Sequence, residues 1–420
     1  MKTKRLLCIF LSFMMLFSAC GRKETERADE NSGVTTEETA GTGKEEPPET
    51  RTDPEEASDT RTETEAGAET GNAPELQITV ERDTKYNAAN LQLSPEEFEA
   101  VGFALGDSCD LAFSNGVTIS DVPYYNGYYV RNGEPVIVSY PGFTYVSITY
   151  NNAGIWDAAG LSEGDTVTIT LHEAGKYAAV QESLGQVYSF LREDYETDEE
   201  FCNFREIRGG RLKEGLLYRG ASPVDNERGR AAFTDSLLRE NGIAFVLDLA
   251  DSEEDLASYR AQADFASDYT LGLFENGQVA LLSMGSAYQS QEYREKLVSG
   301  LRQMLLSPGP VYIHCMEGKD RTGFVCMLLL ALAGGTYEEL RADYMLTYRN
   351  YYKISEEATP EKYEAVSELY FDAFLEYLHG EEGLDWSSFP DFVSDAENYL
   401  LSGGMTEEEI GELKSFLTGE

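Results

Sequence analysis

Residues 314–323 place a nucleophilic side chain close to two cationic side chains. The run reads His314-Cys315-Met316-Glu317-Gly318-Lys319-Asp320-Arg321-Thr322-Gly323, with a cysteine six positions before an arginine. A cysteine thiolate is a nucleophile, and a helix N-terminus with nearby cations favours its formation. An arginine guanidinium binds two phosphate oxygens at once. The spacing therefore indicates attack on a phosphate ester by Cys315, with Arg321 holding the oxygens.

The flanking residues predict the elements that position this run. Residues 309–313 form a short β-rich apolar stretch, and residues 324–333 form an apolar helical stretch that stops at two glycines. Strand, tight loop and buried helix present backbone N–H groups to an anion at the helix N-terminus. We expect the phosphate-binding residues to be Met316, Glu317, Gly318, Lys319, Asp320 and Arg321. Two neighbours are supporting candidates: Thr322 as a donor to the leaving sulfur, and His314 as a group that orients the thiolate or the loop.

The loop resembles that of the bacterial cysteine-dependent protein tyrosine phosphatases whose loop reads His-Cys-x-x-Gly-Lys-Asp-Arg-Thr-Gly. The resemblance extends to Leu217–Ser222, to the strand-like residues 245–249 and to the helical tail 399–417. It covers roughly residues 200–420. It implies a tyrosine or dual-specificity phosphatase that forms a phosphocysteine intermediate and needs neither metal nor another cofactor. Its substrate would be a phosphorylated protein.

The general acid is predicted within the loop itself. Ester cleavage requires a proton for the leaving oxygen, and no aspartate lies between Asp268 and Asp320. In the resembled branch the aspartate at the position of Asp320 is the proposed acid. We expect Asp320 to donate the proton in the first step and to act as base in the second. The alternative is that its carboxylate only fixes the loop by accepting amide hydrogen bonds.

Three alternatives to a protein phosphatase follow from the same residues: a phosphoinositide phosphatase, a binding module and a redox sensor. Lys319 adds positive charge, as in similar loops that accept phosphoinositides, whereas a Glu317 carboxylate at the rim would repel polyanionic head groups. Lys319 is alternatively a solvated surface lysine. A catalytically silent loop would leave a phospho-ligand binding module. Redox sensing by Cys315 would explain neither Lys319 nor Arg321.

Net charge restricts the class of partner. The chain has 420 residues, of which 33 are basic and 76 acidic, for a net charge of −43. This balance argues against nucleic-acid binding, which requires a basic surface. Local groups must therefore create the positive site. Arg219 is predicted to reach a phosphate or, more simply, to form a structural salt bridge, and Asp248 to brace the loop or to cap the end of its strand.

The N-terminus predicts an exported lipoprotein. Residues 1–20 combine a basic start, a twelve-residue largely apolar stretch and small residues before Cys20, as in a bacterial lipoprotein signal. Acylation of Cys20 would anchor the chain at the extracytoplasmic face of the membrane; the alternative is an ordinary signal peptide. Residues 21–75 are predicted to be a disordered tether, because acidic residues outnumber basic ones 17 to 6 between 22 and 75 and no aromatic residue is present there.

The rest of the chain divides into two predicted domains. Residues 76–178 are β-rich, with strands expected at 133–140 and 165–171 and an aromatic hairpin at 124–129. They resemble the small β-barrel attached to adenosyl-transferring hydrolases, whose catalytic domain is absent. Residues 179–420 alternate strands and helices, which predicts a mostly parallel sheet flanked by helices. Cys326 is expected in the core, and pairing of Cys109 with Cys202 is left open.

Overall fold

The structure is a computed structural model of the chain, and it describes residues 73–140, 143–185, 188–307, 309–389 and 391–420. The predicted signal, Cys20 and almost all of the predicted tether lie outside these residues. The described residues, from 73 to 420, belong to one compact unit. Among the described residues, no helix has the length and apolar character needed to cross a membrane.

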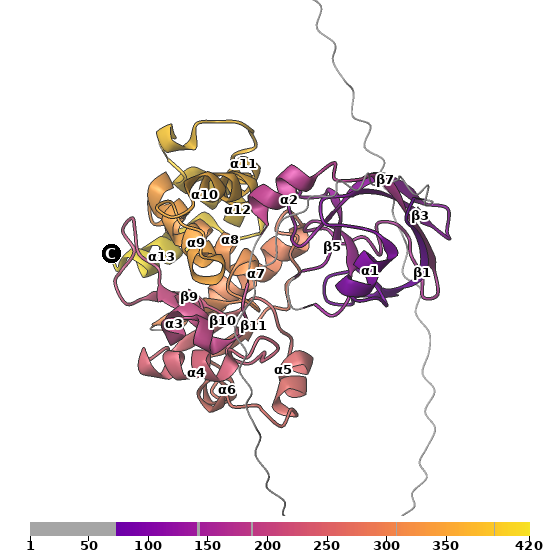
Figure 1. Ribbon diagram of the computed structural model, residues 1–420. Helices are drawn as coiled ribbons and strands as arrows, with labels where there is room; N and C mark the ends of the chain where they lie inside the picture. The colour runs from indigo at the N-terminus through magenta and orange to yellow at the C-terminus, as the bar shows by residue number, and fades with distance from the viewer. Residues whose placement is uncertain (1–72, 141–142, 186–187, 308, 390) are drawn as a thin grey trace, which may run out of the picture. The chain divides into compact units, whose positions relative to one another are not determined.

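The first described region is a closed barrel of seven strands in the order β1-β2-β6-β5-β4-β3-β7. Its elements are β1 (Glu75–Arg82), β2 (Ala89–Leu91), α1 (Pro95–Val101), β3 (Ser108–Phe113), β4 (Thr118–Tyr125), β5 (Pro135–Val138), β6 (Ser147–Tyr150) and β7 (Thr166–Glu173). Figure 1 shows these strands and α1 in purple. The β-rich region is therefore a closed barrel with its own apolar core.

One predicted element of the barrel is wrong. Tyr124 and Tyr125 end β4, and they pair in parallel with Ile137 and Val138 of β5. A hairpin at 124–129 would require antiparallel neighbours joined by a tight turn. The segment between β4 and β5 is instead a crossing connection, because the barrel closes through a parallel pair that local sequence signals do not reveal.

The second region is built on a five-stranded sheet in the order β11-β10-β12-β9-β8. Its strands are β8 (Arg205–Glu206), β9 (Leu217–Gly220), β10 (Phe245–Asp248), β11 (Val279–Leu281) and β12 (Val311–His314). All neighbours pair in parallel except β8 and β9, which pair antiparallel. The predicted mixed α/β fold is confirmed. The domain boundary predicted between residues 178 and 179 stays a prediction.

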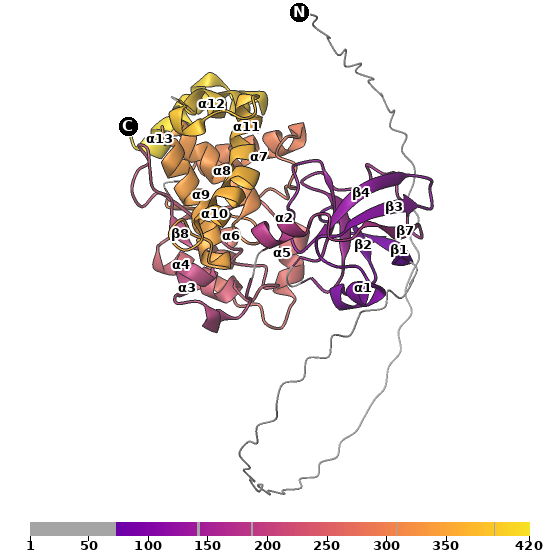
Figure 2. The same ribbon diagram turned by 45° about the horizontal axis from the view of Figure 1, so that its top comes forward.

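Helices cover both faces of this sheet. They are α2 (Ala178–Leu184), α3 (Asp198–Phe201), α4 (Ala231–Glu240), α5 (Glu253–Arg260), α6 (Asp268–Glu275), α7 (Gln291–Met304), α8 (Asp320–Leu332), α9 (Tyr337–Tyr352), α10 (Pro360–Val366), α11 (Ala373–His379), α12 (Val393–Ser402) and α13 (Glu407–Thr418). Short 3-10 turns occupy Arg192–Asp194 and Trp386–Ser388, and a π-helical turn spans Ser367–Asp372. Figures 1 and 2 show α8, α9 and α12 on one side of the sheet and α3 and α4 on the other.

Helix α8 forms the centre of the core. All its residues but the first are buried, so it is apolar on every side rather than amphipathic, as expected of a helix enclosed by other elements. Cys326, in its middle, is fully buried as predicted. Cys109 and Cys202 are both buried free thiols, one in β3 and one directly after α3, and they do not pair with each other.

Candidate functional site

The predicted loop lies at the carboxyl end of the central strand. Strand β12 is flanked by β10 and β9 and ends at His314. Cys315 is the first residue beyond it, and α8 starts at Asp320. Ligands of open parallel sheets bind at the carboxyl ends of their strands, so the strand-loop-helix arrangement expected from the sequence is in the expected place.

The loop carbonyl oxygens are turned away from the site. Donors behind the loop bind these oxygens. The Met316 carbonyl accepts from the Ser222 N–H at 2.9 Å, and the Glu317 carbonyl accepts from the Tyr351 hydroxyl at 2.8 Å. The Gly318 carbonyl accepts from the Arg219 guanidinium at 2.9 Å and from the Asn203 amide at 3.2 Å. In a trans peptide the C=O and the following N–H point in opposite directions. The N–H groups of residues 317–319 therefore face away from these donors, as an anion-binding loop requires.

Gly318 is required by the tightness of this loop. Its φ is +66°, a left-handed conformation that residues with a Cβ adopt only under strain. A Cβ built there would lie 2.1 Å from the carbonyl oxygen of Gly220 in β9. The loop therefore packs directly on the end of the neighbouring strand, and only glycine allows that approach.

A buried ion-pair network supports the loop from behind. The fully buried Arg219 guanidinium pairs with Asp343 of α9 at 2.5 Å. Arg205 bonds to the same carboxylate at 3.1 Å. Arg219 is thus the structural salt-bridge residue that the sequence suggested, and its second nitrogen reaches the Gly318 carbonyl. Asp343 has its pKa held below the ordinary value, because these two guanidinium groups outweigh the effect of burial.

Cys315 and Arg321 both line a cavity of about 290 Å³. The Cys315 residue is only 3% exposed. The Arg321 guanidinium donates a hydrogen bond to the Met284 carbonyl at 2.7 Å, which fixes its direction. Burial acts to lower the pKa of Arg321, but the neighbouring Cys315, Tyr86, Tyr293 and Asp251 side chains together outweigh it and raise that pKa. The arginine therefore stays cationic in the cavity.

Asp320 opens onto the same cavity. Its side chain is 58% accessible, and Lys319 Nζ lies 3.7 Å from its carboxylate. Although the carboxyl is open to the cavity, the protein atoms around it desolvate it and raise the pKa of Asp320, while Lys319 acts to lower that pKa. A carboxyl that keeps its proton to higher pH than usual is suited to donate that proton to a leaving group.

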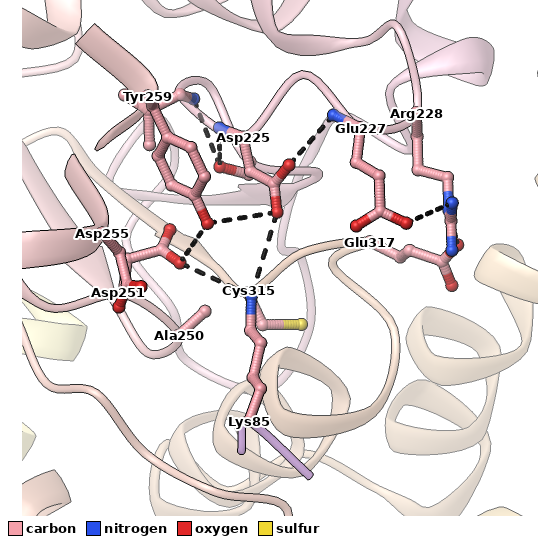
Figure 3. Close-up of polar contacts among 12 residues, drawn as sticks. Lys85, Asp225, Glu227, Arg228, Ala250, Asp251, Asp255, Tyr259, Cys315 and Glu317 are labelled. Atoms are coloured by element: carbon pink, nitrogen blue, oxygen red, sulfur yellow. Dashed lines mark hydrogen bonds and ion pairs between the residues drawn. The ribbon is translucent and has the colours of Figure 1, made fainter. Parts of the chain in front are cut away.

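Lys319 and Glu317 are not free charges at the rim. The Lys319 ammonium is buried and lies 3.1 Å from the Tyr140 hydroxyl and 3.3 Å from that of Tyr352. This rules out the solvated lysine considered from sequence. The Glu317 carboxylate is also buried and accepts a hydrogen bond from Tyr188 at 2.8 Å. It faces Arg228 at 3.6 Å, away from the thiol (Figure 3).

The remaining supporting candidates lie close to the loop. His314 Nδ1 is 3.1 Å from the Cys315 carbonyl, and burial lowers the pKa of this histidine to about 4. Asp248 accepts hydrogen bonds from the N–H groups of Ala250 and Asp251, so it caps the end of β10. The Thr322 hydroxyl is buried and has no hydrogen-bond partner among the described residues. Its donation to the sulfur stays a prediction.

The sequence did not predict a contribution from the barrel. Lys85 and Tyr86, which lie between β1 and β2, line the cavity together with Cys315. Asp225 and Asp251, which follow β9 and β10, face Lys85 (Figure 3). The position of these aspartates after predicted strands was a usable signal, but no local signal marks Lys85 or Tyr86. Among the described residues, no cluster of three or more His, Cys, Asp or Glu side chains is arranged to hold a metal ion.

Comparisons with known proteins identify a family for this chain. A model described as "Tyrosine phosphatase family" matches residues 196–419, which is just over half of the chain. The tyrosine-protein phosphatase of Nostoc commune is 32% identical over 112 residues, which cover 25% of this chain. The match spans 38% of that relative's length.

Solved structures of low identity also match. The crystal structure of P. aeruginosa TpbA is 17% identical, with a TM-score of 0.21, over 52% of this chain and 92% of that chain. A variant of TpbA in complex with pTyr is 15% identical, with a TM-score of 0.25, over 48% of this chain and 96% of that chain.

Proposed function

Because this chain belongs to the tyrosine phosphatase family through residues 196–419, we propose that it hydrolyses phosphotyrosine in proteins through a phosphocysteine intermediate. A dual-specificity phosphatase, which also hydrolyses phosphoserine and phosphothreonine, is the broader form of this proposal. The observation that carries this proposal is the loop itself. Its carbonyl oxygens are held outward at residues 316–318, and Cys315 and Arg321 share one cavity.

The first chemical step is displacement at phosphorus. The Cys315 thiolate forms the S–P bond while the bond from phosphorus to the leaving oxygen breaks. Asp320 gives its proton to that oxygen, and the alcohol or phenol departs. Arg321 and the loop N–H groups stabilise the charge on the equatorial oxygens, where preorganised donors lower the barrier most.

The second step restores the enzyme. Water attacks the phosphocysteine, and the Asp320 carboxylate takes up the proton that the water loses. The S–P bond breaks, inorganic phosphate leaves, and Cys315 is again a thiolate. A single carboxyl thus acts as acid and then as base, as microscopic reversibility allows.

The surroundings of the loop favour an aryl phosphate over a phosphoinositide. The cavity wall contains many aromatic rings, including Tyr86, Tyr128, Tyr140, Phe143, Tyr288 and Phe374. The lysines at the site are already paired with tyrosine or carboxylate groups. A polyphosphorylated head group requires unpaired cations, whereas a phenyl ring packs well on aromatic side chains.

The test is phosphate release by the purified chain. Matched phosphotyrosine and phosphoserine peptides and a phosphoinositide are compared under reducing conditions with a chelator present. We expect the phosphotyrosine peptide to be cleaved most efficiently and the Cys315→Ser variant to be inactive. A phosphoinositide preference would support the alternative substrate class. No release from any substrate, with phosphotyrosine still bound, would indicate a binding module.

We also propose that the chain is an exported membrane lipoprotein attached through Cys20. Support comes from the basic, apolar and small-residue order of residues 1–20. Palmitate labelling of cells that produce the chain tests this, with Cys20→Ala as the control. Equal labelling of both forms would contradict the proposal. Export without labelling would favour an ordinary signal peptide.

A further inference from the structure

A hairpin loop of the barrel forms part of the wall of the catalytic cavity. Residues 83–88 connect β1 to β2, and Asp83, Lys85, Tyr86, Asn87 and Ala88 all line the cavity that contains Cys315. The family match starts at residue 196. This loop therefore brings side chains to the site from outside the phosphatase region.

The loop has a defined conformation. The Asp83 carboxylate accepts hydrogen bonds from the N–H groups of Lys85 and Tyr86, each at 2.9 Å. The Asn87 carbonyl accepts the N–H groups of Ile155 and Trp156, also at 2.9 Å. Such side-chain-to-backbone bonds fix a turn without a longer strand pair. Lys85 and Tyr86 are therefore held by the barrel in one direction.

Lys85 is tied to two carboxylates of the phosphatase region. Its ammonium lies 3.9 Å from Asp225 and 3.8 Å from Asp251, and the Tyr259 hydroxyl donates to both carboxylates (Figure 3). Asp225 and Asp251 are 8% and 1% exposed. Buried carboxylates need a cation nearby to remain charged, so this contact holds the barrel loop to the loops that follow β9 and β10.

Tyr86 lies over the phosphate-binding arginine. The centre of its ring is 6.0 Å from the Arg321 guanidinium carbon and 5.9 Å from Lys85 Nζ. Its ring is thus placed beside the position that a phosphate bound by Arg321 would occupy.

We propose that Tyr86 is a specificity residue that packs against the aromatic ring of the substrate, and that Lys85 is the positioning residue that holds it there. The substrate class is then aryl phosphates, with phosphotyrosine as the protein-borne member. This inference rests on the proposed phosphatase function and adds a substrate contact made by the barrel.

The kinetic test separates the ring contact from the phosphate contact. Tyr86→Ala should raise the KM for phenyl phosphate and a phosphotyrosine peptide about three- to ten-fold, the range of an aromatic contact. The inhibition constant of inorganic phosphate, which has no ring, should stay unchanged. Tyr86→Phe, which keeps the ring, should behave as wild type. A parallel rise in KM and in the phosphate inhibition constant would show a merely structural role and overturn the proposal.

The positioning role is tested by charge. Lys85→Met should raise the KM for aryl substrates as Tyr86→Ala does, and Lys85→Arg should restore it, because it keeps a cation for Asp225 and Asp251. The matched control is Lys176→Met, since Lys176 pairs with Asp121 inside the barrel. Loss of aryl affinity in the control, or no loss in Lys85→Met, would contradict the assignment.

A binding experiment keeps this inference separate from the catalytic one. Calorimetry measures the affinity of free O-phosphotyrosine for Cys315→Ser and for Cys315→Ser combined with Tyr86→Ala. A three- to ten-fold weaker affinity in the double variant supports the ring contact even if the wild-type chain releases no phosphate. Equal affinities, or no binding to either form, would overturn it whatever the catalytic result.

Discussion

The Arg219 guanidinium donates a 2.9 Å hydrogen bond to the Gly318 carbonyl oxygen, so a strand residue 99 positions earlier in the chain sets the orientation of a peptide in the catalytic loop. The other end of the same guanidinium pairs with Asp343. Arg219 is completely buried and lies behind the loop rather than in the cavity. Its observed role is therefore to fix the direction of the Gly318 peptide, and in the proposed function this aims loop N–H groups at the substrate phosphate.

Replacing Arg219 should harm both stability and turnover. Arg219→Met leaves Asp343 buried with only Arg205 as partner, and loss of one member of a buried pair costs about 3 kcal/mol. Urea unfolding should show this loss, and kcat should fall because the Gly318 peptide is free to turn. The control Arg208→Met breaks a solvent-exposed pair with Glu206 and should change neither quantity. Unchanged kcat in Arg219→Met would contradict the orienting role.

Gly318→Ala should inactivate the loop. The new methyl group would meet the Gly220 carbonyl oxygen, and the backbone would be strained at a φ of +66°. Displacing donors by about 1 Å lowers kcat/KM about 100-fold. Gly277→Ala is the matched control, because Gly277 has a φ of +71° but no heavy atom within 4 Å of the added Cβ. It should lose some stability and keep its kcat, so equal activity losses in the two variants would refute a local clash.

Asp320→Asn should remove the basic limb of the pH–rate profile. A general acid is active while protonated, so activity falls as pH rises through its pKa, which burial raises for Asp320. With the poor leaving group of phenyl phosphate, kcat should fall about 100-fold or more. With p-nitrophenyl phosphate, whose leaving group needs little protonation, the loss should be much smaller. An unchanged profile would leave Asp320 only a role in loop geometry.

Lys319→Met should move that basic limb to higher pH. The Lys319 ammonium lies 3.7 Å from the Asp320 carboxylate and acts to lower its pKa. Without this charge the carboxyl keeps its proton to higher pH, so the active form persists to higher pH than in the wild type. Steady-state kinetics between pH 5 and 9 with phenyl phosphate measure the shift. A limb that moves to lower pH would mean that Asp320 is not the titrating acid.

Asp251→Asn should stabilise the chain at alkaline pH. Burial, reinforced by Asp248, raises the pKa of Asp251 to about 7. Between about pH 4 and pH 7 the folded state then binds more protons than the unfolded state, so the free energy of unfolding falls as the pH rises. The variant lacks this titration and should exceed wild type by about 4 kcal/mol at pH 8, because the pKa of Asp251 lies about three above its ordinary value.

Thermal or urea unfolding at pH 4 provides the internal control for Asp251→Asn. Both forms carry an uncharged group there, so their stabilities should converge. His314, whose pKa is lowered to about 4, titrates in both forms and largely cancels in the difference. A difference between the two forms that is the same at pH 4 and pH 8 would show that the substitution acts through packing instead.

The sequence by itself determined the strand, the loop and the helix that carry the proposed catalytic residues. Cys315, Gly318 and Arg321 lie within seven consecutive residues, and their geometry follows from one β12-to-α8 connection. The last helix likewise starts with a capping box, Thr406 with Glu409, whose two partners lie in one turn. Local features of this kind depend on backbone geometry over a few residues.

Only the tertiary structure decided what surrounds that loop. Lys319 turned out to be buried against Tyr140, 179 residues away, and Tyr86 was brought over Arg321 from another β-structured region. The parallel pairing of β4 with β5, in place of a hairpin, has the same origin. Such contacts join elements that are distant in sequence, and their energy comes from burial and charge pairing once the chain has folded, so no spacing in the sequence records them.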